Sequence, residues 1–300
     1  MKRHMVARIR TWTDDTLLTH IRNIENLIIS RIRLSSDDVA IIKKNLELKN
    51  MYVGKRCFVL GNGPSLDTED LTQLKAEYVF TVNQCMRRKD FKKIKTNFHF
   101  WADPVFYSSD MTKAENLEML NIFKQVNAGN SNPKCFMPIA GKKFVMETHL
   151  DDIAEFYYFN STQSMYPGMK KDFKFEKDAP GFGTVVQYCI AMAIYMGFQH
   201  IYVLGIDGTG IITNINSALK EDVSNSYGYE MTENEKLRLQ KMMESNSIEA
   251  YVRTYLQEIV GYKYLFEYCQ RKNIELINCS SKSAIQALPR KTLKEVLENA

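Results

Sequence analysis

Apolar and polar positions divide the chain into a helical beginning and a longer region in which short apolar runs alternate with helices. In residues 13–50, apolar side chains recur every three or four positions, which predicts helix. Ser35 and the polar residues after it interrupt this pattern, and they can cap a second helix that extends through Leu46. Residues 1–53 are therefore predicted to form a helical extension. Its apolar stripe needs a cover, either from the main domain or from another subunit.

The pattern changes at Gly54, after which short apolar runs predict buried strands. The expected strands are residues 56–60, 78–82, 97–101, 134–137, 156–159, 200–204 and 274–278. The expected helices are residues 67–75, 184–196 and 248–270, with Gly197 as a helix stop. This alternation predicts an α/β, Rossmann-like fold, in which helices cover both faces of a mostly parallel sheet.

Residues 54–290 are accordingly predicted to form one Rossmann-like, nucleotide-binding catalytic domain, and residues 291–300 a C-terminal helical tail. Within this domain, residues 208–247 are polar and carry few apolar anchors. A compact domain seldom contains so long an irregular stretch unless it is a lid or is disordered. We therefore expect a lid-like insertion at residues 208–247.

Composition narrows the choice of partners only slightly. The net charge of +5 favours acidic partners such as phosphates, nucleic acid or an anionic membrane surface, but selects none of them. We expect no nucleic-acid partner. None of the six cysteines forms a CxxC pair, so no zinc spacing is visible, and buried thiols in a reducing, cytoplasmic compartment are expected. No apolar run is long enough to span a membrane. The basic residues of positions 2–10 suit either weak contact with the inner face of the cytoplasmic membrane or a solvated helix face.

Small and amide-bearing residues follow several of the expected strands. In an open α/β sheet, ligands bind outside the carboxyl ends of the strands, so these residues are candidates for a binding site. The candidates are Gly61, Asn62, Gly63, Ser65, Asn83, Gln84, Asp103, Gly205, Asp207, Asn278, Ser280 and Ser281. Asparagine and glutamine side chains both donate and accept hydrogen bonds, which suits a base, a ribose or a phosphate.

The turn at residues 61–66, Gly-Asn-Gly-Pro-Ser-Leu, is the first candidate phosphate site. Glycines allow close approach of the backbone to a ligand, and amides at the start of a following helix can hold a phosphate. The turn matches neither the dinucleotide fingerprint nor the phosphate loop, and a tight strand–helix turn is the alternative interpretation. A second glycine loop places Gly183 and Thr184 at the start of a helix, where Thr184 can cap the helix or a ligand anion can bind.

Two aspartates and two tyrosines are the candidate catalytic residues. Asp103 and Asp207 follow strands, and each could act as a general base or as a Mg²⁺ ligand. The alternative for Asp207 is a carboxylate bound to the amides of neighbouring loops. Tyr227 and Tyr229 lie in the expected lid, where they could donate hydrogen bonds to a leaving phosphate or simply pack the lid down.

Four sequence runs resemble one bacterial superfamily. They are GKRCFVLGNGPSL from Gly54, FTVNQ from Phe80, HFWADP from His99, and GFGTVVQYCIAMAIYMGFQHIYVLGID from Gly181. The superfamily includes the family 42 sialyltransferases, the motility accessory factors that glycosylate flagellin, and hydroxymethylpterin diphosphokinase-like proteins. The resemblance covers residues 54–290 and implies a Rossmann-like domain with a lid.

The resemblance also implies roles for individual residues. In the sialyltransferases a cytidine monophosphate donor contacts the positions that match Asn62, Gly63, Asn83 and Thr184. An asparagine of the third strand corresponds to Asp103 here.

This sequence departs from the sialyltransferases at three positions. Their general base, a histidine, would fall near Leu256, and no histidine follows His200. A tyrosine of the family is Thr209 here, and a serine is Val185. The resemblance therefore implies a largely retained donor site, together with a sugar other than sialic acid, a different base or a different transfer reaction.

The leading hypothesis is a glycosyltransferase that uses a nucleotide-activated sugar, with a cytidine-monophosphate-linked sugar as one option. Its acceptor would be a glycan or a lipid-linked molecule in bacterial surface polysaccharide or glycan synthesis. Asp103 or Asp207 would act as base, and Tyr227 or Tyr229 would assist the leaving phosphate. The first alternative is a Mg²⁺-dependent pyrophosphoryl transferase, and the second is a non-catalytic nucleotide-binding or assembly protein. The N-terminal helices could join copies of the chain into a homo-oligomer.

Overall fold

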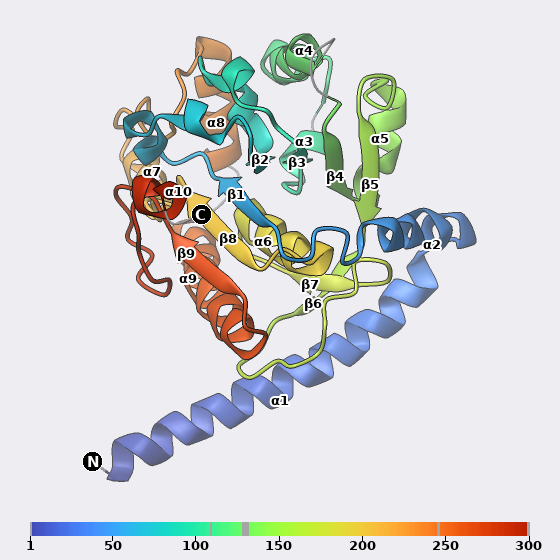
Figure 1. The fold of residues 1–300 in the computed structure, drawn as a ribbon, viewed down its shortest axis with the longest axis vertical. Coiled ribbons are helices and arrows are strands. Elements are labelled where there is room, and N and C mark those ends of the chain that lie inside the picture. The colour runs from blue at the N-terminus through green and yellow to red at the C-terminus, as the bar shows by residue number, and fades with distance from the viewer. Residues whose placement is uncertain (1, 109, 128–131, 245–246, 299–300) are drawn as a thin grey trace.

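The fold is that of a parallel α/β protein, seen in a computed structural model that describes residues 2–108, 110–127, 132–244 and 247–298. In that part of the chain, seven parallel strands form one sheet in the order β5-β4-β3-β2-β1-β8-β9 (Figure 1). The strands are β1 (Arg56–Leu60), β2 (Tyr78–Val82), β3 (Phe98–Phe100), β4 (Lys134–Pro138), β5 (Glu155–Phe159), β8 (His200–Leu204) and β9 (Glu275–Asn278). The predicted α/β, Rossmann-like fold is confirmed.

The central strands are apolar along their whole length because both faces of the sheet are covered. In β1, Cys57 and Val59 point to one face and Phe58 and Leu60 to the other, and all four side chains are fully buried. Val59 pairs in register with Val203 of β8. The first face packs on α6 (Val185–Met196), which ends at Gly197 with a left-handed φ of 93°, the stop expected from the sequence.

The remaining helices complete two layers around the sheet. α9 (Ile248–Arg271) packs on α6, whereas α4, α5 and α10 cover the opposite face. The helices not yet given bounds are α3 (Val105–Ser108), α4 (Ala114–Asn127), α5 (Lys142–Glu147), α7 (Gly210–Ala218), α8 (Glu233–Glu244) and α10 (Leu293–Glu298). All six cysteines are buried and free, as expected.

The N-terminal extension consists of α1 (Lys2–Arg33), α2 (Ser36–Lys43) and the 3-10 helix Lys44–Leu48. Ser35 caps α2 in a capping box with Asp38, as the sequence predicted. α1 lies along a small second sheet formed by β6 (Ser161–Ser164) and β7 (Ala179–Gly181) (Figure 1). None of the helices within the described residues is long and apolar enough to cross a membrane.

Two local predictions were wrong. Residues 67–75 do not form one helix but belong to the 3-10 helices Pro64–Thr68 and Leu71–Leu74, because the Asp70 side chain accepts the amide of Thr72 and begins a new turn. Residues 208–247 are here called the lid segment, and its described part, 208–244 and 247, is not weakly structured, since it contains α7 and α8. A small separate core within it is formed by Tyr229, Met231, Leu239 and Met243.

Candidate functional site

The site begins where the order of strands reverses, between β1 and β8. Open α/β sheets bind ligands in the crevice outside the strands at such a point. The two strand ends are held together by the amide of Gly61, which donates to the Leu204 carbonyl (2.8 Å), and by that of Gly63, which donates to the Gly205 carbonyl (2.9 Å). A Cβ on residue 61 would lie 2.3 Å from the Gly205 oxygen, so this position requires glycine.

Asp207 binds the turn of residues 61–66 rather than facing a ligand with a free carboxylate. Its Oδ2 accepts the amide of Ser65 (2.8 Å) and its Oδ1 accepts the Ser65 hydroxyl. A Cβ on residue 63 would lie 2.5 Å from Oδ1, so Gly63 makes room for this contact. The geometry matches the alternative interpretation of Asp207, a carboxylate bound to a neighbouring loop, and not the predicted general base.

The same hydrogen bonds correct the expectation of a phosphate held by this turn. The amides of Gly61, Gly63 and Ser65 all donate within the protein. The segment that follows is a short 3-10 helix rather than an α-helix. The turn therefore shapes the crevice, and it contributes Asn62 and Gly63 to the pocket lining.

A pocket of about 220 Å³ lies outside the ends of β1, β2 and β8. It is lined by the predicted residues Asn62, Gly63, Asn83, Thr184, Asp207 and Tyr227, together with residues of α7 and α9. The side-chain oxygens of Asn62 and Asn83 are buried and have no hydrogen-bond partner among the described residues. Buried polar atoms are rarely left unpaired, so these two oxygens are available to accept hydrogen bonds from a ligand or from water.

The backbone positions both amides. Asn83 follows β2 directly and has a left-handed φ of 46°, a conformation that asparagine adopts more readily than most residues. Asn62 donates from Nδ2 to the carbonyl of Val82 (3.3 Å). The ends of β1 and β2 thus present two amide oxygens to one pocket.

Glu258 also lines the pocket, although it was not among the residues expected from the sequence. Of the described residues that line the pocket, two carry a carboxylate, Asp207 and Glu258. Burial raises the pKa of Glu258 to about 7. Glu258 lies one helical turn before the buried Tyr262, whereas Leu256, the position counted for the missing histidine, is 60% exposed.

The backbone around Glu258 is fixed by the start of α6. The Glu258 carbonyl accepts a hydrogen bond from Nε2 of Gln187 (2.6 Å). Oε1 of the same Gln187 side chain accepts a hydrogen bond from the amide of Gly183 (3.2 Å). A Cβ on residue 183 would lie 2.9 Å from the Glu258 nitrogen, so glycine allows α6 and α9 to approach. Thr184 holds the N-cap position, but its side chain makes no capping hydrogen bond.

Several predicted site residues do not line the pocket. Asp103 accepts the amide of Val105 at the start of α3 (3.1 Å), and burial raises the pKa of its carboxyl. Ser280 accepts the amide of Ile206 (3.1 Å) and Ser281 contacts the hydroxyl of Thr68 (2.7 Å). Both serines therefore support the loops behind the site.

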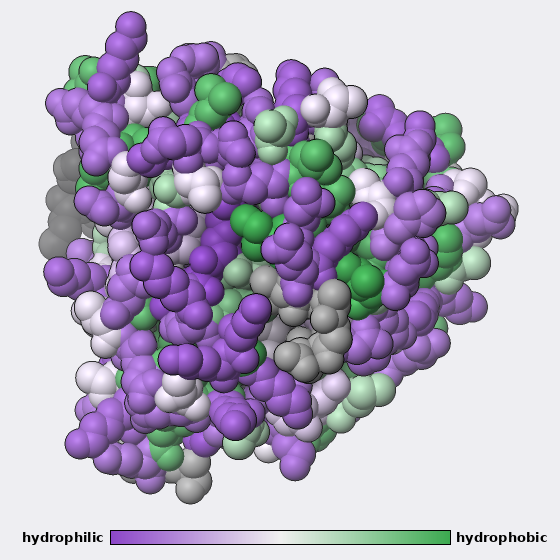
Figure 2. Space-filling model, turned by 90° about the horizontal axis from the view of Figure 1, so that it is seen from above, coloured by the Kyte–Doolittle hydropathy of each residue, from purple (hydrophilic) through white to green (hydrophobic). Residues whose placement is uncertain are grey.

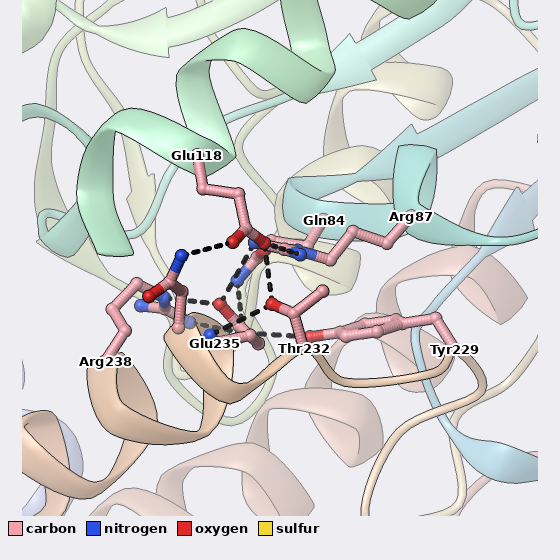
Figure 3. A network of polar contacts seen from close by, with 8 residues as sticks. Gln84, Arg87, Glu118, Tyr229, Thr232, Glu235 and Arg238 are labelled. Atoms are coloured by element: carbon pink, nitrogen blue, oxygen red, sulfur yellow. Dashed lines mark hydrogen bonds and ion pairs between the residues drawn. The ribbon is translucent and has the colours of Figure 1, made fainter. Parts of the chain in front are cut away.

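Gln84 belongs to a polar network that joins α8 and the residues just before it to α4 and to the 3-10 helix after β2 (Figure 3). Its Nε2 donates to Glu235 of α8 (2.6 Å), which is fully buried and also pairs with Arg238 (2.8 Å) and Arg87 (3.4 Å). Glu118 of α4 accepts from Thr232 of the lid segment (2.6 Å). The face of the molecule over α4 and α8 is mostly hydrophilic, with scattered hydrophobic residues (Figure 2).

Tyr227 and Tyr229 differ in position. The amide of Gly228 donates to the Asn62 carbonyl (2.8 Å), and its carbonyl accepts from Nη1 of Arg88 (2.5 Å), which brings Tyr227 into the pocket lining. Burial raises the pKa of Tyr227 to about 12, so its hydroxyl stays protonated near neutral pH. Tyr229 stacks on Tyr227 (5.4 Å between ring centres) and lies outside the lining.

The described residues do not provide the carboxylates that the Mg²⁺ hypothesis needs. No group of three or more histidine, cysteine, aspartate or glutamate side chains is placed to hold a metal in that part of the chain. Both oxygens of Asp207 accept from Ser65, and Asp103 is not in the pocket lining. The donor set therefore does not fit a Mg²⁺ ion bound between these two aspartates.

The family follows from a match that covers β1 to β8 but neither β9 nor Tyr227 and Glu258 of the pocket. Residues 37–209 match the family described as 6-hydroxymethylpterin diphosphokinase MptE-like. The chain belongs to the MptE-like family. No curated protein matches the sequence.

This MptE-like protein is also similar to two solved structures, each at 15% identity. One is the MAf glycosyltransferase from Magnetospirillum magneticum AMB-1 (TM-score 0.44), where the match covers 85% of this chain and 38% of that chain. The chain thus spans well under half of that protein. The other is the sialyltransferase CstII from Campylobacter jejuni, solved with cytidine-5'-monophosphate (TM-score 0.42), where the match covers 79% of this chain and 85% of that one.

Proposed function

We propose that this protein transfers a sugar from a nucleotide-activated donor to a hydroxyl group of a glycan or lipid-linked acceptor, with Glu258 as the general base. The observation that carries the proposal is the position of Glu258 in the same pocket as the unpaired oxygens of Asn62 and Asn83. The amide oxygens supply acceptors for the N–H and O–H groups of a nucleoside. Glu258 supplies the proton acceptor that the absent histidine would otherwise provide.

The two substrates and Glu258 account for every bond and proton of this transfer. The acceptor oxygen attacks the anomeric carbon, and Glu258 takes the hydroxyl proton. The bond between that carbon and the donor phosphate oxygen breaks, and the electron pair leaves with the phosphate. A carboxylate whose pKa is about 7 is substantially ionised at neutral pH and still basic enough to accept a proton. Tyr227, which keeps its proton, can donate a hydrogen bond to the departing phosphate.

The donor requires more space than the pocket now offers. Ligand pockets commonly enclose about 300–1,000 Å³, and this one encloses about 220 Å³. Residues of the lid segment, including Thr209 and Tyr227, form one side of it. We therefore expect the lid segment to move outward when a nucleotide sugar enters. The reaction would take place in the cytoplasm, where buried free thiols stay reduced.

The proposal is tested by ligand-dependent thermal unfolding with a panel of nucleoside monophosphates, diphosphates and nucleotide sugars. A ligand at 100 times its Kd should stabilise the fold by about 2.7 kcal/mol. We expect protection by one nucleotide series, transfer or hydrolysis of its sugar by the wild type, and protection without turnover in Glu258→Gln. Lack of protection by every member of the panel would overturn the proposal.

A pyrophosphoryl transferase is the second candidate, because the family is described by a 6-hydroxymethylpterin diphosphokinase. Such a reaction requires Mg²⁺ between phosphates and carboxylates. ATP turnover with a hydroxymethylpterin that stops on chelation of Mg²⁺ would favour it over sugar transfer. Nucleotide binding without turnover of any substrate would favour a binding protein.

A further inference from the structure

A second pocket, of about 400 Å³, lies next to the pocket that contains Glu258, which is here called the nucleotide pocket. Its walls are β6, the loop of residues 181–183 before α6, and α9. Ligand pockets commonly enclose about 300–1,000 Å³, so the second pocket can hold a small ligand as it stands. None of its described lining residues belongs to the lid segment, so entry does not depend on movement of that segment.

Two neighbouring faces of α9 line the two pockets. Glu258 and Tyr262, one helical turn apart, line the nucleotide pocket. Four other residues of α9 line the second pocket, at intervals of three, one and three positions, which place them on one helix face. They are Gln257, Val260, Gly261 and Tyr264. The carboxylate proposed as base therefore lies on a helix that borders both pockets.

The loop before α6 also borders both pockets. Gly183 lines the second pocket, and the next residue, Thr184, lines the nucleotide pocket. A Cβ on residue 183 would lie 2.9 Å from the Glu258 nitrogen and 3.3 Å from the Gln257 Cβ, so this loop packs directly on α9. The two pockets thus flank a single contact between residues 183–184 and residues 257–258. A molecule that extends past this contact from the second pocket meets the side chain of Glu258.

The second pocket has an uncharged, hydrogen-bonding lining. Charged residues make up 25% of the chain, but none of the described residues that line this pocket is acidic or basic. A phosphate, a carboxylate or an amine would find no ion-pair partner among them. The lining instead contains amide and hydroxyl side chains, which both donate and accept hydrogen bonds, as the hydroxyl groups of a sugar do. They are Ser161, Thr162, Gln163, Ser164, Gln187 and Gln257.

Some of these polar side chains are held in place by the protein, and others are exposed. Gln187 is fully buried, and both ends of its amide are bonded within the protein. The hydroxyl of Ser161 donates to the Pro180 carbonyl (3.1 Å). Ser164 of β6 and Gln257 of α9 are exposed, and they approach the pocket from two different walls. The pocket therefore combines a fixed polar base with side chains that can turn toward a ligand.

Aromatic side chains complete the lining. Phe182 and Tyr264 are partly buried against the main core and also line the second pocket. Aromatic rings offer a large, rigid apolar surface, and a tyrosine adds a polar group at its edge. The C–H face of a sugar ring can cover such a surface while the hydroxyl groups of the sugar bond to the amides. This combination fits a neutral saccharide better than it fits an ion.

We propose that the second pocket binds a neutral sugar of the acceptor and directs one of its hydroxyl groups to Glu258. This inference rests on the proposed sugar transfer, and it adds the chemical class of the acceptor. The donor nucleotide then occupies one side of the contact between residues 183–184 and 257–258, and the acceptor sugar occupies the other. Glu258 lies at the boundary, where the proton must be taken from the acceptor hydroxyl.

Saturation-transfer NMR and calorimetry of the full chain test the chemical class of the ligand. The panel contains glucose, galactose, N-acetylglucosamine, N-acetylgalactosamine and disaccharides of these sugars. N-acetylneuraminic acid serves as an anionic sugar, and a serine blocked at both ends serves as a peptide. We expect at least one neutral saccharide to bind, and neither the anionic sugar nor the peptide. If no neutral saccharide binds, or only the anionic sugar or the peptide does, the inference is wrong.

Substitutions on the two walls test the place of binding. Gln257→Ala should weaken saccharide binding roughly tenfold, the loss of one hydrogen bond, and Ser164→Ala/Gln257→Ala should weaken it further. Gln270→Ala is the matched control, because Gln270 is also exposed on α9 and lies outside the lining. It should bind the saccharide as the wild type does. Equal affinity of the wild type and the double variant would overturn the inference.

Nucleotide-dependent thermal unfolding separates this inference from the proposed function. Protection by a nucleotide without binding of any neutral saccharide would overturn the acceptor site and leave the donor site in place. Saccharide binding without protection by any nucleotide would overturn sugar transfer, and with it the acceptor role of this pocket. In turnover assays, Gln257→Ala should raise KM for the acceptor roughly tenfold. An unchanged KM for the acceptor would show that the sugar bound in this pocket is not the acceptor.

Discussion

Asp207 accepts two hydrogen bonds from Ser65, one from its amide (2.8 Å) and one from its hydroxyl. The pair joins the loop after β8 to the turn after β1, across the point where the strand order reverses. Asp207 is 6% exposed, so little water can replace a lost partner. The contact between Asp207 and Ser65 therefore stabilises the turn of residues 61–66, from which the Asn62 side chain reaches the pocket.

Removal of either partner should destabilise the fold, and removal of both should cost less than the sum. Ser65→Ala leaves a buried carboxylate oxygen without its donor, which we expect to lower the free energy of unfolding by about 1–3 kcal/mol. Asp207→Ala should have a comparable effect. Urea unfolding of both single variants and the double variant should give a coupling energy of about 0.5–3 kcal/mol. Strict additivity would show that the two side chains do not act together.

Glu258 should make the protein less stable as the pH rises. Burial raises its folded pKa from 4.5 to about 7, so the folded state binds more protons than the unfolded state between these values. Stability should therefore decrease from pH 4.5 to pH 7, by about 3 kcal/mol in total. Glu258→Gln removes the titrating group and should be about 2–3 kcal/mol more stable than the wild type at pH 8, with no advantage at pH 4.5.

Glu249→Gln is the control for this measurement. Glu249 lies on the same helix, and its side chain is 73% exposed. We expect this variant to follow the wild-type stability curve at every pH. If Glu258→Gln does the same, then Glu258 does not carry a raised pKa in the folded protein.

The same carboxylate should determine the pH dependence of turnover. A general base must be ionised, so kcat/KM for the sugar acceptor should rise with pH to a plateau, with a midpoint near pH 7. Glu258→Gln should lower kcat by about 10²–10⁴-fold and remove this limb. Asp207→Asn alters the contact with Ser65 and not the proposed base, so its kcat/KM should still rise with pH. If kcat/KM of Glu258→Gln still rises with pH around pH 7, another group is the base.

The sheet was predictable because each parallel strand is buried on both faces, which leaves uninterrupted apolar runs such as Cys57–Leu60 and Ile201–Leu204. The rule that ligands bind at strand ends also points to Asn62 and Asn83, and both line the pocket. Gln84 and Asp103 do not line it, since adjacency to a strand end does not fix which way a side chain points. Gln84 turns to Glu235, a partner 151 residues away.

Glu258 was harder to predict because nothing in the local sequence distinguishes it from the solvated acids of α9. Its burial arises from contact with Gly183 and Gln187, which are remote in the sequence. The helices of the lid segment were not predicted, for a similar reason. The network around Glu235 stabilises α8 through partners on α4 and after β2, so polar residues there replace the apolar pattern expected of a packed helix.

Asn83 can be tested without disturbing its backbone. Its φ of 46° suits glycine, so Asn83→Gly should retain the fold while it removes the unpaired amide oxygen from the pocket. We expect roughly a tenfold loss of nucleotide affinity, the equivalent of one hydrogen bond of about 1.4 kcal/mol. Calorimetry with the nucleotide found by thermal unfolding gives the measurement.

Asn273→Gly is the matched control for Asn83→Gly. Asn273 has a φ of 53° and precedes β9, far from the pocket lining. Its substitution should leave nucleotide affinity unchanged. Equal affinity in the wild type and in both variants would exclude Asn83 from donor binding.

Gly228 should be essential to the closed lid segment, in contrast to Gly210 in the same segment. A Cβ on residue 228 would lie 2.8 Å from both Nη1 of Arg88 and the Gly63 carbonyl, whereas a Cβ on residue 210 meets no atom within 4 Å. Gly228→Ala should therefore displace Tyr227 from the pocket, lower the melting temperature and weaken donor binding. Gly210→Ala should be neutral or slightly stabilising, by up to about 1 kcal/mol, because alanine restricts the unfolded chain. Parallel melting curves with and without the nucleotide test both variants. Indistinguishable behaviour of the two would mean that the hydrogen bond from Gly228 to Asn62 does not hold the lid segment over the site.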